Sequence, residues 1–432
     1  MHPATQIFYD IIFLGLFLLV FLINYKVFQK KLFHPSVLFS AIWLAVILLH
    51  SVCKLTVLPL LYPLSFQSYL IFFLGTVSFT TGSFFSTVME ARKSGLNKTK
   101  SIGLPVNQIL RVILTGICLI GLPFFIQSSV KAFIASQVED FFVGLRNELS
   151  YGDTDIGPTK YLVTFSFLIY GLNLMANIKN KTRLNILLLW LSFAIALTYA
   201  TFSTGRTFFL MIICIYIGIA YVQNKNFRLK RFFLLIPLFL IFFTLFGLIF
   251  GKGGNFENSF NENLQTSSEN TSIYIVTPLS SFDYELVNNK AEANYRGDNT
   301  LRFFYLIGES LGITHLKKYD KSLIKEFVFV PYENNVFTIY SPYVKDFGAV
   351  YAYCFLMLIA GVHTRCHNKA IQSKNARPTI YFALLLYPLL MSFFQDQYML
   401  LFSTWLQMIF FIEAIFFVNR IFFAKIKTGA SQ

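Results

Sequence analysis

The chain has 432 residues, of which 55% are hydrophobic and 18% aromatic, whereas only 13% are charged. Soluble domains carry about 25% charged residues, so this composition excludes a soluble globular protein. The formal net charge of +15 would suit a nucleic-acid-binding protein, but the positions of the basic residues argue against that class, as described below.

Apolar segments dominate the chain from its first residues. About eleven of them have the length, roughly 17–25 residues, that crosses a hydrocarbon core as a helix. The sequence therefore predicts an all-α polytopic integral membrane protein with about 11 transmembrane helices, within a range of 10 to 12. The expected spans are 7–23, 36–53, 66–88, 108–127, 160–178, 184–203, 207–223, 232–250, 347–363, 379–395 and 399–419.

Basic residues alternate between rich and poor connections along these spans. Lysine and arginine collect on the cytoplasmic side of membrane proteins, so the rich connections are expected to be cytoplasmic. The N-terminus is then expected outside and the C-terminus in the cytoplasm. The positive charge indicates topology and contact with anionic lipid headgroups, and no nucleic-acid partner is expected. The rich connections are 26–31, 92–100, 179–183, 225–231 and 365–377.

Three parts follow in chain order. Residues 1–250 hold eight helices and a smaller outer loop at 128–159, residues 251–345 form a large outer loop, and residues 346–432 hold three helices and a cytoplasmic tail. A signal peptide is not expected, because the first six residues lack its basic region.

The large loop is predicted to contain both mobile and helical segments. Residues 255–271 are rich in Asn, Ser, Glu and Gln and are expected to be mobile. Residues 273–287 and 298–311 carry apolar residues at helical spacing, which predicts short amphipathic helices on the outer membrane face. Asp298, Asn299 or Thr300 would supply the N-cap of the second helix.

Cysteine usage gives no sign of a disulfide framework or a zinc site. The five cysteines are scattered, no pair has CxxC spacing, and the large loop contains none. No metal and no cofactor are expected.

Arg206 is the first candidate site residue. It lies in residues 201–207, Thr-Phe-Ser-Thr-Gly-Arg-Thr, a polar hinge between two apolar segments. A guanidinium presents a planar fork that suits phosphate oxygens, and exposed backbone amides of the hinge can join it. The structural alternative is an arginine that extends to the membrane surface and caps a helix end.

Arg146 lies in the smaller outer loop, near Glu148, Asp153 and Asp155. A local ion pair with one of these acids is the favoured interpretation, and substrate binding is the alternative. An exposed pair of this kind contributes less than about 1 kcal/mol.

Arg296 and Arg302 lie in the large loop, in an aromatic-rich segment that includes Tyr305. An arginine beside aromatic rings suits a ligand with both phosphate and sugar, and equally a plain cation–π contact.

A further group of candidate residues precedes the ninth span. Its amide and phenol groups are typical sugar-binding groups, and loop capping is their structural alternative. In particular, Asp346 could cap a helix starting near Phe347. The group consists of Asn334, Asn335, Tyr340, Tyr343 and Asp346.

These residues resemble a known pattern. A Ser-Thr-Gly-Arg-Thr hinge at 203–207, a large outer loop, and the run Asn-Asn-Val-Phe-Thr-Ile-Tyr at 334–340 followed by Tyr-Val-Lys-Asp-Phe-Gly at 343–348 are similar to the Wzy family. This family comprises the O-antigen and capsular repeat-unit polymerases of bacterial cytoplasmic membranes. The layout matches over nearly the whole chain, and the residues match at about 201–210 and 328–351, with a weaker match around Arg146.

The resemblance implies a metal-independent glycosyltransferase with the C-type membrane fold. Its substrates would be oligosaccharide repeat units on undecaprenyl pyrophosphate at the outer leaflet, and a polysaccharide chain-length regulator would be a further partner. Arg206 and Arg302 would stabilise the leaving pyrophosphate, and Asp346 would orient the site or act as base. Arg146 would position substrate. Some relatives carry an arginine followed, after ten residues, by a glycine, and the large loop of this chain departs from that pattern. The resemblance therefore does not identify which arginine of the large loop is catalytic.

Two alternatives remain. An O-antigen ligase would fit the Arg-x-x-x-Leu spacing of Arg302 and Leu306, but ligases usually carry a histidine where this chain has Asn334 and Asn335. A lipid-linked oligosaccharide flippase or other transporter would place ionisable residues near the bilayer midplane, whereas this chain places them at the outer surface.

Overall fold

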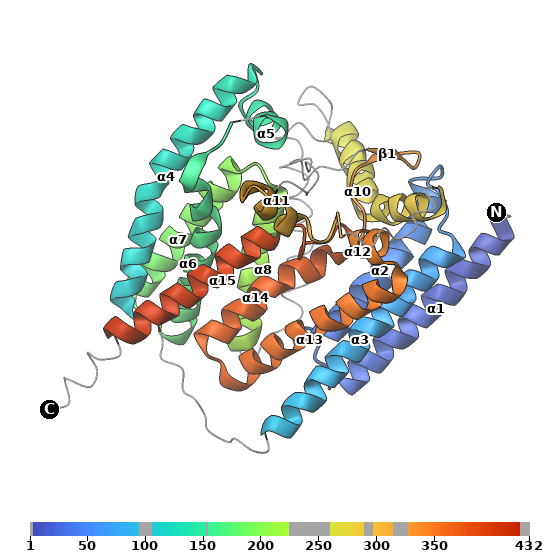
Figure 1. The fold of residues 1–432 in the computed structure, drawn as a ribbon, viewed down its shortest axis with the longest axis horizontal. Helices are drawn as coiled ribbons and strands as arrows, with labels where there is room; N and C mark the ends of the chain where they lie inside the picture. The colour runs from blue at the N-terminus through green and yellow to red at the C-terminus, as the bar shows by residue number, and fades with distance from the viewer. Residues whose placement is uncertain are drawn as a thin grey trace. The chain divides into compact units, whose positions relative to one another are not determined.

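The computed structural model describes residues 3–94, 106–152, 154–223, 260–288, 297–313 and 327–423 (Figure 1). Within these residues, nine helices are long and apolar enough to cross a membrane, and Thr207–Gln223 is a shorter apolar helix. The expectation of an all-α polytopic membrane protein is confirmed. The span predicted at 232–250 lies outside the described residues.

The helices form two compact units. The first contains described residues of 1–98, 268–368 and 388–402, and the second contains those of 99–267, 369–387 and 403–432. Much of the large loop therefore packs with the N-terminal helices, although more than a hundred and fifty residues separate them in the chain. Each unit is described below by itself.

The first unit is built on three neighbouring membrane helices, α1, α2 and α3, which pack side by side (Figure 1). Each of them corresponds to a predicted span. The elements that lie wholly or mostly in this unit are α1 (Pro3–Val27), α2 (Pro35–Thr56), α3 (Phe66–Ser94), α10 (Phe260–Asn288), α11 (Arg302–Ser310), β1 (Val328–Phe329), β2 (Glu333–Asn334), α12 (Tyr340–Phe347) and α13 (Ala349–Ser373).

An aromatic core joins four of these helices. The ring of Trp43 on α2 lies 5.0 Å from Phe72 on α3 and 5.0 Å from Tyr340 on α12, measured between centroids. Phe282 on α10 lies 5.2 Å from Phe72. All four side chains are buried. Tilted and edge-to-face rings of this kind add stability beyond the area they bury, so α10 and α12 are integral parts of the unit.

The structure corrects two expectations for α10. Residues 260–271, predicted to be mobile, belong to one helix that continues to Asn288. The segment 273–287 does not lie on the surface, because residues 276–283 are all buried. The polar side chains of α10 have partners inside the unit: Ser280 hydrogen-bonds to His50 at 3.0 Å, and Asp283 accepts the backbone N–H of Ser65 at 2.7 Å. These distant partners make burial of a polar helix favourable.

The second unit contains the remaining helices. Within it, α4, α6 and α7 pack together, and α8 packs on α6. The last residues of α14, η2 and the first residue of α15 belong to the first unit. η2 spans Met391–Phe393. The elements that lie wholly or mostly in the second unit are α4 (Gln108–Ser136), α5 (Phe141–Tyr151), η1 (Gly157–Lys160), α6 (Tyr161–Lys179), α7 (Arg183–Phe202), α8 (Arg206–Gln223), α14 (Ala376–Leu390), α15 (Phe402–Val418) and η3 (Asn419–Phe423).

A buried arginine that was not among the predicted site residues links three helices of the second unit. Arg111 on α4 donates to the side-chain oxygens of Asn173 on α6 at 3.1 Å and of Asn185 on α7 at 2.8 Å. Asn173 in turn donates to Thr115 at 3.2 Å. The sequence does contain a signal for this contact, because an arginine inside an apolar span needs polar partners on neighbouring helices.

Helices α3 and α13 approach closely at Gly82. A Cβ added to Gly82 would lie 2.7 Å from the Cα of Met357, a distance that real Cβ atoms do not show. Small residues allow such close backbone contact between membrane helices. Four residues further along α3, Ser86 donates to the backbone oxygen of Gly361 at 3.2 Å.

We expect Gly82→Ala to lower the thermal unfolding temperature of the purified protein in detergent, because the two backbones must separate. Overpacking of this kind costs about 1–3 kcal/mol. Gly361→Ala is the matched control: a Cβ at Gly361 meets nothing within 4 Å, so only the helix propensity improves, by about 1 kcal/mol. Equal unfolding temperatures for the two variants would contradict the close contact.

Candidate functional site

The two units divide the predicted site residues between them. Arg146 and Arg206 belong to the second unit, and Arg296 lies outside the described residues. The first unit holds Arg302, Tyr305, Asn334, Asn335, Tyr340, Tyr343 and Asp346.

The polar hinge predicted at 201–207 is present in the second unit. Helix α7 ends at Phe202, and the hydroxyl of Ser203 donates to the backbone oxygen of Tyr199 at 2.7 Å. Thr204 has a φ of 53°, a left-handed conformation that β-branched residues rarely adopt. Helix α8 then begins at Arg206. The first N–H groups of a helix have no intrahelical acceptor and favour anions, so Arg206 starts an element suited to phosphate.

The structure brings the helix that carries Arg146 to the same end of this unit. The side chain of Asp140 caps α5 by accepting the N–H of Val143 at 2.8 Å. The next ring, Phe141, lies 6.0 Å from Phe202 at the end of α7, measured between centroids. Arg146 follows one turn later and is half-buried. The two arginines of the second unit thus lie on elements that meet.

Two of the acids near Arg146 bind residues of the following connection. Glu148 accepts the backbone N–H of Thr154 at 3.2 Å and its hydroxyl at 2.5 Å. Asp155 forms an ion pair with Lys160 at 2.9 Å. Both contacts stabilise the connection between α5 and η1, while Asp153 lies outside the described residues.

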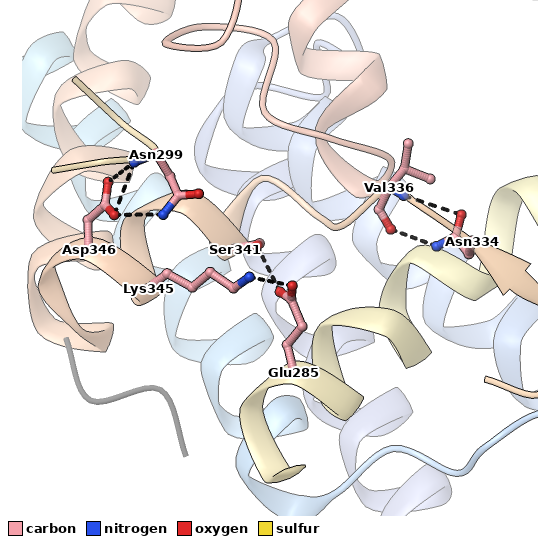
Figure 2. A network of polar contacts seen from close by, with 7 residues as sticks. All are labelled: Glu285, Asn299, Asn334, Val336, Ser341, Lys345 and Asp346. Carbon is pink, nitrogen blue, oxygen red and sulfur yellow. Dashed lines mark hydrogen bonds and ion pairs between the residues drawn. The ribbon is translucent and has the colours of Figure 1, made fainter. Parts of the chain in front are cut away.

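Asp346 holds the turn from which Arg302 extends (Figure 2). Its carboxylate is fully buried and accepts the backbone N–H groups of Asn299 at 3.0 Å and of Thr300 at 2.6 Å. The side-chain amide of Asn299 adds a bond of 2.8 Å. Helix α11 begins two residues later, at Arg302.

These contacts correct two capping expectations. The N-cap of α11 is Leu301, without a side-chain cap, because the amides of the preceding turn bind Asp346 instead. Asp346 lies inside α12 and does not cap the following helix, which begins at Ala349. Gly348, with a φ of 82°, separates the two helices, and only glycine adopts this conformation readily.

Lys345, the residue before Asp346, connects α12 to α10 (Figure 2). Glu285 on α10 forms an ion pair with Lys345 and accepts the hydroxyl of Ser341 at 3.2 Å. Two consecutive residues of α12 therefore connect it to α10 and to the turn before α11. The pairing of Lys345 with Glu285 could not be predicted from the sequence, because 60 residues separate them in the chain.

The two tyrosines predicted to bind sugar are fully buried. Tyr340 donates its hydroxyl to the backbone oxygen of Phe72 at 3.1 Å, and Tyr343 donates to Asp396 at 3.0 Å. Burial raises the pKa of both phenols well above the ordinary value. Both hydroxyls are therefore engaged in hydrogen bonds inside the core of the unit.

Asp396 binds the backbone that leads into α15. It is fully buried and accepts the N–H groups of Tyr398 and Met399, each at 3.0 Å. Burial raises the pKa of Asp396, although these hydrogen bonds act in the opposite direction. Asp396 has the same role as Asp346, since each carboxylate satisfies the amides of a non-helical segment.

The two neighbouring asparagines, Asn334 and Asn335, differ in how deeply they are buried. Asn334 is buried, and its side-chain amide donates to Ser281 at 2.7 Å and to the backbone oxygen of Val336 at 2.6 Å (Figure 2). Asn335 is half-buried. Of the two, Asn335 is therefore the residue with exposed surface for a ligand.

Arg302 and Tyr305 share one face of α11, since they are three residues apart. Both are half-buried. Adjacent rings on another face pack against Phe402: the centroid of Phe303 lies 5.3 Å away and that of Phe304 lies 5.4 Å away.

Within its own unit, each of Arg206 and Arg302 lies where its charge would suit an anionic ligand. Arg206 begins α8 after the hinge, and Arg302 begins α11 after the turn that Asp346 binds. Guanidinium groups bind phosphate oxygens strongly. Within the described ranges, no three His, Cys, Asp or Glu side chains gather as they would around a metal ion.

Comparison with known proteins identifies one relevant similarity. The chain is 25% identical, over 253 residues, to a protein of Escherichia coli (strain K12) described as "Putative O-antigen polymerase". The match covers 57% of this chain and 56% of that protein, so the aligned part spans little more than half the length of the relative. No family model matches the chain, and no solved structure matches it.

We expect Asp346→Ala to loosen the segment that carries Arg302. The variant removes the acceptor of the Asn299 N–H and leaves the buried N–H of Thr300 unpaired, at a cost of about 1–3 kcal/mol for the buried group. Hydrogen–deuterium exchange should therefore accelerate in residues 299–310. Glu333→Ala is the control, because Glu333 is exposed and should leave this exchange unchanged. Unaltered exchange in Asp346→Ala would show that the carboxylate does not hold the turn.

Proposed function

We propose that this protein polymerises lipid-linked oligosaccharide repeat units into O-antigen or capsular polysaccharide, as a glycosyltransferase. The observation that carries the proposal is the similarity over 253 residues to a protein described as an O-antigen polymerase. The polytopic helical fold and the arginines next to anchored turns support it.

The proposed reaction transfers the growing chain onto the incoming unit. A hydroxyl of the incoming repeat unit attacks the anomeric carbon at the reducing end of the growing chain. The new glycosidic bond forms, the bond from that carbon to the pyrophosphate oxygen breaks, and undecaprenyl pyrophosphate leaves. The proton of the attacking hydroxyl passes to a base or to solvent.

Arginines would contribute most where negative charge develops. The leaving pyrophosphate gains charge as its bond to the sugar breaks, and a guanidinium already in place stabilises that charge without reorganisation. We assign this role to Arg206 and Arg302, with Arg146 and Arg296 binding substrate. Arg302 is the best supported, since Asp346 fixes the turn immediately before it.

The remaining residues would shape the sugar site. Asn335 and Tyr305 keep exposed surface and would contact the oligosaccharide. Asn334, Tyr340 and Tyr343 would support the site from within the core. We assign Asp346 an orienting role and not that of the general base, because both of its oxygens already accept N–H groups.

The setting would be the outer leaflet of a bacterial cytoplasmic membrane. The alternation of basic residues supports an outer N-terminus and a cytoplasmic C-terminus. A chain-length regulator would be a further partner.

We expect Arg206→Ala and Arg302→Ala each to abolish long polymer in cells while single repeat units still reach their acceptor. Loss of one charge-stabilising group should slow transfer by about a hundredfold or more. The readout is the ladder of chain lengths on a polysaccharide gel. Arg377→Ala is the control, because Arg377 forms an exposed ion pair with Glu413 at 2.5 Å, and such pairs contribute little.

Normal chain length in both site variants would refute the assignment. A deletion strain separates the alternative functions. Loss of both single units and polymer from the surface would indicate a flippase, and accumulation of undecaprenyl-linked polymer would indicate a ligase.

A further inference from the structure

Helix α11 carries a stripe of exposed apolar side chains. Phe304 is 50% exposed, Ile307 is 41% exposed and Leu311, the C-cap residue just after the helix, is 73% exposed. We call these three residues the α11 stripe. Large apolar side chains that lie together and exposed mark a surface for a partner or a membrane.

The stripe is separated from the polar residues of the same helix. At about 100° per residue, its three positions fall within about 60° of one another. Arg302, Tyr305 and Glu309 fall within a similar arc on the opposite side. An apolar face opposite a polar face is the pattern of a helix that lies in the plane of a membrane surface.

The neighbours of α11 include the first residue of a candidate membrane span. Phe303 and Phe304 pack on Phe402, at 5.3 and 5.4 Å between ring centroids. Phe402 is the first residue of a predicted membrane span, Phe402–Ile421. The end of a span marks the boundary of the hydrocarbon core, so α11 lies at that boundary.

The side chains of the stripe are about as exposed as, or more exposed than, side chains on a membrane-spanning helix. On α1, Leu18 is 46% exposed, Leu19 53% and Leu22 51%. These residues belong to the Thr5–Val27 span, whose exposed face meets lipid. Water would penalise an equally exposed stripe on α11, whereas acyl chains would not.

We infer that the α11 stripe lies among the acyl chains of the adjacent lipid leaflet and so holds Arg302 at the level of the lipid phosphates. A helix is about 10 Å across, and the headgroup layer adds about 5–7 Å on each side of the hydrocarbon core. A helix seated by its apolar face therefore brings its polar face to the phosphates. The consequence for Arg302 rests on the proposed function, but the lipid contact does not.

Spin-label accessibility tests the lipid contact on the full chain. The five native cysteines are replaced, single cysteines are placed at Phe304, Ile307 and Leu311, and each is labelled with a nitroxide in nanodiscs of phosphatidylethanolamine and phosphatidylglycerol. Collision rates are measured with oxygen, which concentrates in lipid, and with a water-soluble nickel complex. Ser310→Cys is the control, because Ser310 is exposed and adjoins the stripe in sequence.

The oxygen-to-nickel collision ratio is expected to be several-fold higher at the three stripe positions than at Ser310. A ratio equal to that at Ser310 would place the stripe in water and overturn the inference. Low collision rates with both reagents would show that protein covers the stripe, which overturns it too. Three independent positions keep the test valid if one variant fails to fold.

A second measurement tests the consequence for Arg302. Leu311→Glu adds a charge to the stripe and should shorten the polymer, whereas Ser310→Glu should leave its length unchanged. Polymer of the same length in Leu311→Glu and Ser310→Glu would show that the depth of α11 in the membrane does not affect transfer. The collision measurements need no substrate, so a negative result there would leave the proposed polymerase activity standing.

Discussion

Buried carboxylates hold the non-helical parts of the first unit, and the positions of its functional candidates depend on them. Asp283 accepts an amide of the connection between α2 and α3, Asp346 accepts those of the turn before α11, and Asp396 accepts those of the segment before α15. A backbone N–H buried without an acceptor is costly, and one carboxylate can accept several. Each aspartate therefore fixes the path of a segment that lies between helices.

This constraint connects the core to the proposed chemistry. Helix α12 contributes Tyr340 to the aromatic core, Lys345 to an ion pair with α10, and Asp346 to the turn before Arg302. A guanidinium stabilises a leaving group best when its position is set before the charge develops. Packing inside the unit thus determines where α11, the helix that begins with Arg302, starts. Lipid in contact with α11 would determine the depth of this helix in the membrane.

The predictability of the candidate site differed between its parts. The hinge before Arg206 could be recognised because Ser, Thr and Gly interrupt two apolar runs locally. The burial of α10 could not, because Ser280 and Asp283 find partners more than two hundred residues away. The hydrogen bonds of Tyr340 and Tyr343 inside the core could not be recognised either, because a phenol is equally suited to ligand binding and to a buried hydrogen bond.

By itself, the sequence determined the membrane class, the approximate positions of the described spans and the alternation of basic residues between their connections. These properties are local, because a span needs only sufficient apolar length and a connection only its charge. The tertiary structure decided which polar groups are buried and satisfied. The contacts of Asp346 with Asn299 and of Lys345 with Glu285 join residues 47 and 60 positions apart. Pairing over such distances follows from how the helices pack and has no local signature in the chain.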